Sequence, residues 1–207
     1  MTKICFIYTD TNGLHKCYKP VSTKNLYKIA RLVAVHYIIG DYSDGKFTEI
    51  IRRDIIIKPN AINFNEIAVN IHKITIDIAH AKGIDKIKVI SQLKTDLSDV
   101  KVIVGHSLPF HIKALQGECF RTAIDINFNK YINIDMMSFG HKMEHPKYID
   151  LITKYIDPKG HKKIPHQLDQ YRELFFILYK DYSLTISNTK VISKSIIKPE
   201  DDCDFID

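Results

Sequence analysis

The chain has 207 residues, 45% of them hydrophobic, which is enough to bury a sizeable core and is most simply one domain. Its formal net charge is +6, and five of the acidic residues lie in the last eight positions, so residues 1–199 are more basic than the whole chain and suit contact with a polyanion. No apolar run approaches the ~20 residues that a membrane span needs, and no CxxC pair indicates a zinc finger.

The first half of the chain predicts three strands. Residues 4–9 form an almost continuous apolar run, typical of a buried central strand, and Asn12-Gly13 indicates a turn after it. Residues 26–39 and 47–58 are rich in β-branched and aromatic residues and are separated by Gly40-Asp41 and Ser43-Asp44-Gly45. They predict a β-hairpin that stops at Pro59.

The rest of the chain alternates between helical and strand patterns. Helices are predicted over residues 62–68, with Asn65 as a possible cap, and over 77–83, 86–97, 110–121 and 167–178. Strands are predicted over 100–104 and 132–135. This order predicts an α/β domain, a mixed sheet with helices on both faces.

Several segments resemble one nuclease family in the right order. Residues 4–14, Ile-Cys-Phe-Ile-Tyr-Thr-Asp-Thr-Asn-Gly-Leu, are similar to the first motif of the DEDDh 3′–5′ exonucleases, an apolar strand followed by Asp-x-Glu-Thr-x-Gly-Leu. Further segments follow in the family's order: Ile-Lys-Pro at 57–59, Ile-His-Lys-Ile-Thr at 71–75, Val-Gly-His-Ser-Leu-Pro-Phe-His at 104–111, Ile-Asp-Met-Met at 134–137, and Lys-Ile-Pro at 163–165 followed by Tyr171, Leu174 and Phe175.

The resemblance covers roughly residues 4–193 and includes the epsilon-like (DnaQ-like) phage and viral members of the family. It implies a ribonuclease-H-like fold, a mixed five-stranded sheet with strands one to three antiparallel, flanked by helices. We therefore expect an exonuclease-like domain over residues 1–195 and an acidic C-terminal tail over 196–207. In that tail Phe205 and Ile206 are embedded in charge, which suits either a docking peptide or a solvated terminus.

The resemblance also implies the chemistry of an active member: carboxylates hold two divalent ions, Mg²⁺ or Mn²⁺, and a histidine acts as general base. The family's site positions carry other residues here. They are Tyr8 and Asp10 in the first motif, His111 in the second, and Ser183 and Asn188 in the third. An alternative third register through His166 puts Tyr171 where the acid belongs.

Asp10 is thus the only retained candidate metal ligand, so we expect neither a catalytic residue nor a bound metal. An unorthodox site built from Asp10, Asp135 or Asp181 is the alternative, as is an error in the third-motif register. His141-Lys-Met-Glu-His145 matches a zinc-protease spelling, but Pro146 disfavours the helix that this chemistry needs, so we interpret it as a polar loop or a helix end.

The resemblance further implies that a nucleic-acid strand end would contact backbone and side chains after the first strand and at the second motif. The expected contact residues are Thr11, Asn12, Gly13, Leu14 and His106.

The leading hypothesis is a degenerate exonuclease-fold protein, a pseudoenzyme that binds nucleic acid or acts as a scaffold or accessory subunit of a replication, transcription or virion assembly. An active metal-dependent 3′–5′ exonuclease with a rearranged site and a pure protein-interaction module are the alternatives. A protein partner is expected, single-stranded nucleic acid is a possible one, and no membrane is expected. Met-Thr-Lys leads directly into a strand and the cysteines show no metal spacing, so we expect a soluble, intracellular protein, in the cytoplasm, a virion or a viral replication site.

Overall fold

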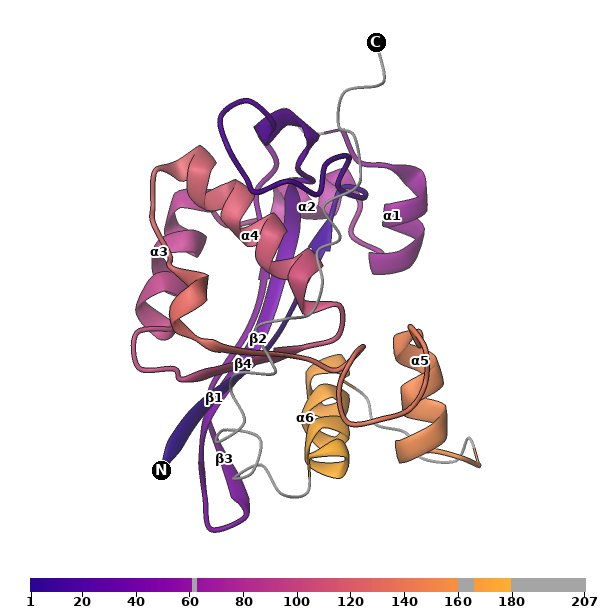
Figure 1. Cartoon of the computed structure of the whole chain (residues 1–207). Coiled ribbons are helices and arrows are strands. Elements are labelled where there is room, and N and C mark those ends of the chain that lie inside the picture. The colour runs from indigo at the N-terminus through magenta and orange to yellow at the C-terminus, as the bar shows by residue number, and fades with distance from the viewer. Residues whose placement is uncertain (61–62, 160–165, 180–207) are drawn as a thin grey trace.

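The computed structural model of the chain describes residues 1–60, 63–159 and 166–179. Its centre is a five-stranded sheet in the order β3-β2-β1-β4-β5 (Figure 1). The strands are β1 (Thr2–Thr11), β2 (Leu32–Ser43), β3 (Lys46–Ile56), β4 (Val102–Gly105) and β5 (Ile132–Asp135). β1 to β3 are antiparallel, and β4 and β5 run parallel to β1. The predicted mixed sheet is confirmed, with its three antiparallel strands first.

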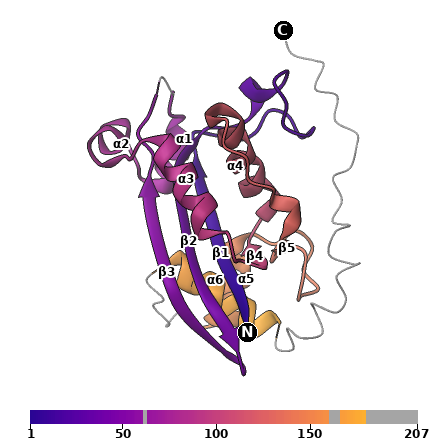
Figure 2. The ribbon, with the colours of Figure 1, turned by 90° about the vertical axis from the view of Figure 1, so that its left-hand side faces the viewer.

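Helices cover both faces of the sheet because side chains alternate along each strand (Figures 1 and 2). Cys5 and Ile7 of β1 face one core with α3 (Lys86–Asp96) and α4 (Leu108–Thr122). Ile4 and Phe6 face the other core, with α5 (Tyr148–Leu151) and α6 (Gln167–Leu178). Two shorter helices, α1 (Glu66–His72) and α2 (Ile76–Lys82), connect β3 to α3.

Most predicted elements appear within a few residues of their expected bounds. The Asn65 cap is confirmed, since its side chain accepts a hydrogen bond from the Ile67 N–H and α1 starts at Glu66. The helix predicted over 167–178 has those bounds. The sequence did not predict α5 and the π-helical turn Ile152–Ile156 that continues it. The polar-loop interpretation of residues 141–145 is confirmed, because no helix forms there and the Nε2–H of His141 donates to the Met136 carbonyl.

The strand predicted over residues 26–39 is wrong in its first part. Residues 26–28 form a turn of 3₁₀ helix, and β2 begins only at Leu32. The carbonyls of Leu26 and Ile29 accept hydrogen bonds from the Arg121 guanidinium, at 2.7 and 2.8 Å, instead of pairing with a strand. A tertiary contact thus overrides the local β preference of this segment.

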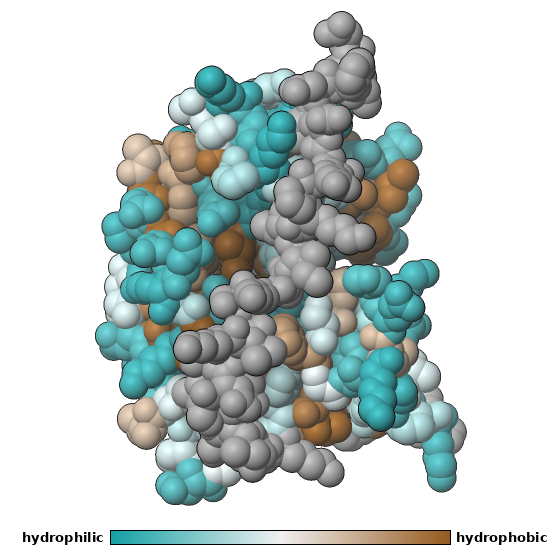
Figure 3. Space-filling model, in the orientation of Figure 1, coloured by the Kyte–Doolittle hydropathy of each residue, from teal (hydrophilic) through white to brown (hydrophobic). Residues whose placement is uncertain are grey.

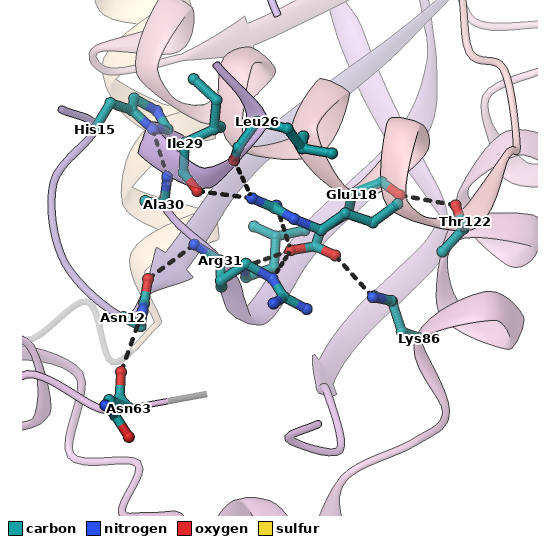
Figure 4. A network of polar contacts seen from close by, with 12 residues as sticks. Asn12, His15, Leu26, Ile29, Ala30, Arg31, Asn63, Lys86, Glu118 and Thr122 are labelled. Atoms are coloured by element: carbon teal, nitrogen blue, oxygen red, sulfur yellow. Dashed lines mark hydrogen bonds and ion pairs between the residues drawn. The ribbon is translucent and has the colours of Figure 1, made fainter. Parts of the chain in front are cut away.

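That contact belongs to a buried ionic network around Glu118, a residue of α4 that is 1% exposed (Figure 4). Its Oε1 accepts hydrogen bonds from Arg31 at 3.0 Å, from Arg121 at 2.9 Å and from the Leu32 N–H at 3.3 Å. Its Oε2 forms an ion pair with Lys86 at 3.3 Å. One carboxylate therefore joins α4 to the start of β2 and to α3.

None of the helices among the described residues combines the length and the hydrophobicity that crossing a bilayer requires.

We predict that Glu118→Gln destabilises the fold by about 3 kcal/mol or more, because the change leaves three buried or half-buried cations without their anion. Urea unfolding followed by circular dichroism measures the free energy of unfolding. Asp99→Asn is the matched control, because Asp99 is 76% exposed and its ion pair is with Lys3, at 3.6 Å. An exposed pair of this kind contributes less than about 1 kcal/mol. Equal losses in the two variants would contradict the prediction.

Candidate functional site

The side chains of the first motif lie at the carboxyl end of β1, among residues of β2 and β3. The sheet register pairs Tyr8 with His36, and His36 with Asp54, in one row across three strands. The Tyr8 ring stacks on the His36 ring, with centroids 4.4 Å apart and an interplanar angle of 10°. Burial, followed by the charges of Asp10 and Asp54, raises the pKa of Tyr8. Tyr8 therefore stays a neutral phenol where the family has an acid.

The retained acid, Asp10, is held by a histidine. His36 Nε2 lies 3.0 Å from Asp10 Oδ2, and His36 Nδ1 lies 2.8 Å from Asp54 Oδ1. Burial lowers the pKa of His36, but the hydrogen bonds to both carboxylates outweigh it, and the pKa is raised. The protonated ring can donate from both nitrogens at once. A protonated ring thus bridges the two carboxylates, and its single positive charge offsets one of their two negative charges.

His111, at the acid position of the second motif, is fixed by backbone groups. Its Nδ1 accepts from the Thr9 N–H at 3.1 Å, and its Nε2–H donates to the His106 carbonyl at 3.1 Å. Because an N–H can only donate and a carbonyl can only accept, these partners define the neutral tautomer. Burial lowers the pKa of His111 to about 4. Both ring nitrogens are occupied, so His111 ties the first turn of α4 to β1 and offers no metal ligand.

A pocket of about 420 Å³ opens beside this row; we call it the cleft pocket. Its lining residues are Tyr8, Asp10, His36, Asp54, Ile56, Ile71, His72, Ile74 and Gln167. His72 Nδ1 accepts from the Ile74 N–H at 3.0 Å, which leaves the proton on Nε2. That Nε2 is buried and has no hydrogen-bond partner among the described residues. The pocket therefore presents an unsatisfied donor beside an acidic pair.

The sequence did not predict His36, Asp54, His72 or Gln167 as site residues. His36 and Asp54 lie on the two strands of the predicted hairpin. The sequence shows both residues, but it does not show that they lie opposite each other, because that depends on the register of the hairpin. A larger hollow of about 560 Å³ lies at the far end of α4, around Cys119, Phe120 and Phe128, and shares no residue with the cleft pocket.

The predicted nucleic-acid-binding residues lie near the same end of β1. Leu14 is 78% exposed. The Thr11 hydroxyl donates to the Gly13 carbonyl at 2.7 Å, and the Asn12 side chain donates to the Asn63 carbonyl at 3.1 Å. His106 is buried, with Nε2 3.0 Å from the Pro146 carbonyl. Their contact with nucleic acid stays a prediction, and Ser183 and Asn188 lie outside the described residues.

The other acids of the expected unorthodox site are also accounted for in part. Burial raises the pKa of Asp135, against the opposing effect of hydrogen bonds from the backbone N–H groups of Met137, Leu108 and Ser107. Asp135 therefore holds the start of α4. Gly105, the last residue of β4, is required for a different reason: a Cβ there would lie 2.9 Å from the Ile7 carbonyl oxygen. Asp181 lies outside the described residues.

These residues do not fit a pair of Mg²⁺ ions. Magnesium takes carboxylate and water oxygens in near-octahedral geometry. Tyr8 is neutral, His111 is bound to backbone, and Asp10 is held by His36. Within residues 1–60, 63–159 and 166–179, no group of three or more His, Cys, Asp and Glu side chains is arranged to hold a metal.

No family model matches this sequence, and no curated protein matches it significantly. Solved structures of exonuclease I do match its fold. A product-bound exonuclease I superposes with a TM-score of 0.64 at 15% identity, over 93% of this chain and 48% of that one. Escherichia coli exonuclease I with a dA16 oligonucleotide gives 0.54 at 17% identity, over 77% and 31%. The enzyme from Methylocaldum szegediense gives 0.53 at 16% identity, over 78% and 31%.

This chain therefore spans half or less of the length of these exonuclease I structures. At such identities the match shows the fold, the ribonuclease-H-like architecture of exonucleases, and its site residues have to be judged from their own geometry.

We predict that the pKa values of His36 and His111 are shifted in opposite directions. In an NMR titration of the imidazole protons, His36 should titrate above the unperturbed value of about 6.5, and His111 only near pH 4.

The linkage to stability follows from these directions. His111 binds a proton more readily in the unfolded chain than in the folded one. Its contribution to the free energy of unfolding is therefore complete above about pH 6.5 and declines by up to roughly 3 kcal/mol as the pH falls toward 4. The contribution of His36 is complete below its unfolded pKa and declines as the pH rises through its folded pKa. A His111 resonance that titrates near 6.5 would contradict the tautomer assigned above.

Proposed function

We propose that this chain is a degenerate exonuclease-fold protein that binds nucleic acid as an accessory or scaffold subunit and does not cleave it by a two-metal route. One observation carries the proposal: both ring nitrogens of His111 bind backbone groups, so the second motif supplies no ligand. The fold match to exonuclease I gives the architecture, and solved exonuclease I structures include a complex with single-stranded DNA and one with a dA16 oligonucleotide.

The charge balance of the cleft supports the loss of metal chemistry. Two-metal catalysis needs several carboxylates to compensate two divalent ions. Here His36 lies 3.0 Å from Asp10 and 2.8 Å from Asp54, and His166 Nε2 lies 3.3 Å from the same oxygen of Asp54. A metal would have to displace a protonated ring from both carboxylates. The nearby His72 adds no negative charge, because burial lowers its pKa.

Groups around the cleft pocket support the proposal that the chain binds nucleic acid. Ile71, which lines the cleft pocket, is 77% exposed. The buried Nε2–H of His72 offers a donor to an acceptor atom of an incoming group. A body that is basic outside its last eight residues attracts polyanions at long range.

An end-labelled single-stranded oligonucleotide, incubated with Mg²⁺ and separately with Mn²⁺, tests the proposal. We expect no shortening of the label-bearing product in either ion, together with binding that weakens steeply as salt increases. Asp10→Ala is the control: any trace digestion that survives this substitution comes from a contaminant.

Digestion by the native protein that Asp10→Ala abolishes would establish an active, rearranged metal site and refute the proposal. Absence of both digestion and binding would favour a protein-interaction module instead.

A further inference from the structure

The segment between β1 and β2 carries a concentrated positive charge. Residues 11–40 contain no Asp or Glu, although the chain has 24 such residues in all. Lys16, Lys19 and Lys24 are exposed, and Lys28 is partly exposed. In Figure 3 the upper part of the molecule, where Figure 1 draws this segment, has a predominantly hydrophilic surface. The ion pairs among the described residues do not include Lys16, Lys19 or Lys24. We call residues 15–30 the tyrosine–lysine loop.

Aromatic rings are interleaved with these lysines on the outer side of the loop. His15 and Cys17 point inward and are 5% and 1% exposed, while the intervening Lys16 is exposed. Tyr18 is 55% exposed and Tyr27 is 78% exposed. Both rings therefore keep much of their surface free for contact with a ligand.

The loop is held rigidly although it contains only one turn of 3₁₀ helix. His15 Nδ1 accepts from the Ala30 N–H at 3.1 Å, and its Nε2–H donates to the Phe110 carbonyl at 3.0 Å. The Lys16 N–H donates to the Lys28 carbonyl at 2.8 Å, which brings the two arms of the loop together.

A second set of bonds closes the tip of the loop. Asn25 accepts from the Ser22 N–H at 2.8 Å and donates to the Pro20 carbonyl at 2.9 Å. The Arg121 guanidinium donates hydrogen bonds to the carbonyls of Leu26 and Ile29, two of the residues labelled in Figure 4. The rings and lysines therefore stand on a preorganised base, so a ligand would not have to order them on binding.

Exposed aromatic rings among lysines suit single-stranded nucleic acid. Unpaired bases stack on aromatic faces, and lysines neutralise the phosphates between them. Duplex DNA offers no free base faces to Tyr18 and Tyr27, and an acidic protein would use the lysines without needing the rings. Lysine-rich composition accounts for basic residues anywhere on the chain, but not for a 30-residue stretch without acids that also exposes two tyrosines.

We propose that the tyrosine–lysine loop is a contact surface for single-stranded nucleic acid, separate from the cleft pocket, in which Tyr18 and Tyr27 stack on bases and Lys16, Lys19 and Lys24 contact phosphates. This surface shares no residue with the cleft pocket, so its binding does not depend on whether the cleft retains nucleic acid.

Fluorescence anisotropy with a labelled single-stranded oligo-dT, measured across a salt series on the whole chain, tests the proposal. Tyr18→Ala/Tyr27→Ala should weaken binding roughly tenfold or more, while Tyr18→Phe/Tyr27→Phe should keep nearly full affinity because the stacking face remains. Replacing Lys16, Lys19 and Lys24 by alanine should reduce the slope of log Kobs against log salt by about 2, since each phosphate contact on a single strand contributes about 0.7.

The matched control replaces Lys46, Lys94 and Lys101 by alanine, with the same change in charge. Lys101 lies at the other end of the sheet, where its N–H bonds to the Lys3 carbonyl. This end is separated from the loop by the ten residues of β1, about 30 Å. The control should leave the salt slope unchanged, and thermal unfolding should be alike in all variants because the substituted side chains are exposed.

Several outcomes overturn the proposal: unchanged affinity in the tyrosine-to-alanine variant, an equal loss of slope in the control, or competition by polyglutamate as strong as by unlabelled oligonucleotide. A cleft variant, Ile71→Ala, separates this proposal from the proposed function, because Ile71 lines the cleft pocket and is exposed. Loss in the loop variants alone supports the loop and refutes cleft binding, whereas loss in the cleft variant alone does the reverse.

Discussion

The buried carboxylate of Glu118 is the constraint on which the arrangement of the molecule depends. A charge removed from water must be compensated, and here the compensation comes from Arg31, Lys86 and Arg121, which belong to three different parts of the chain. Satisfying this one anion fixes α4 against the start of β2. The position of α4 then brings His111 to Thr9, and the grip of Arg121 on the Leu26 and Ile29 carbonyls shapes the segment after β1.

The cleft solves the same electrostatic problem in another way. In this chain the ring of His36 lies between the carboxylates of Asp10 and Asp54. The substitution at Tyr8 belongs to the same solution, because the phenol stacks on that ring instead of adding a third negative charge. His111 is separate: it became a backbone bridge, with a pKa lowered to about 4 by burial. Tyr8, Asp10 and His111 therefore all take part in contacts that hold the fold together.

The sequence predicted the strands and most helices because their patterns are local: apolar runs, caps and turn residues. The sequence-based prediction was wrong at residues 26–31, where a tertiary contact with Arg121 outweighs the local preference for a strand. It missed α5 because four residues are too few to show a helical repeat of apolar positions. Tyr8, Asp10 and His111 could be placed by resemblance alone. His36 and Asp54 could not be predicted as site residues, because their contact depends on how β2 pairs with β3. That register shifts between Ile39 and Gly40. His111's bonding depends on a contact across 102 residues.

The strand order has a consequence for how the protein is made. β1, β2 and β3 form a meander complete by residue 56, whereas the parallel neighbour β4 arrives only at residue 102. The row of Tyr8, His36 and Asp54 is thus synthesised before β4, and its contacts span fewer residues than the 102 that separate Thr9 from His111. Glu118 and His111 emerge much later. A nascent chain can therefore form the row of Tyr8, His36 and Asp54 early, while the hydrophobic faces of the three strands stay exposed until α3 to α6 are synthesised and cover them.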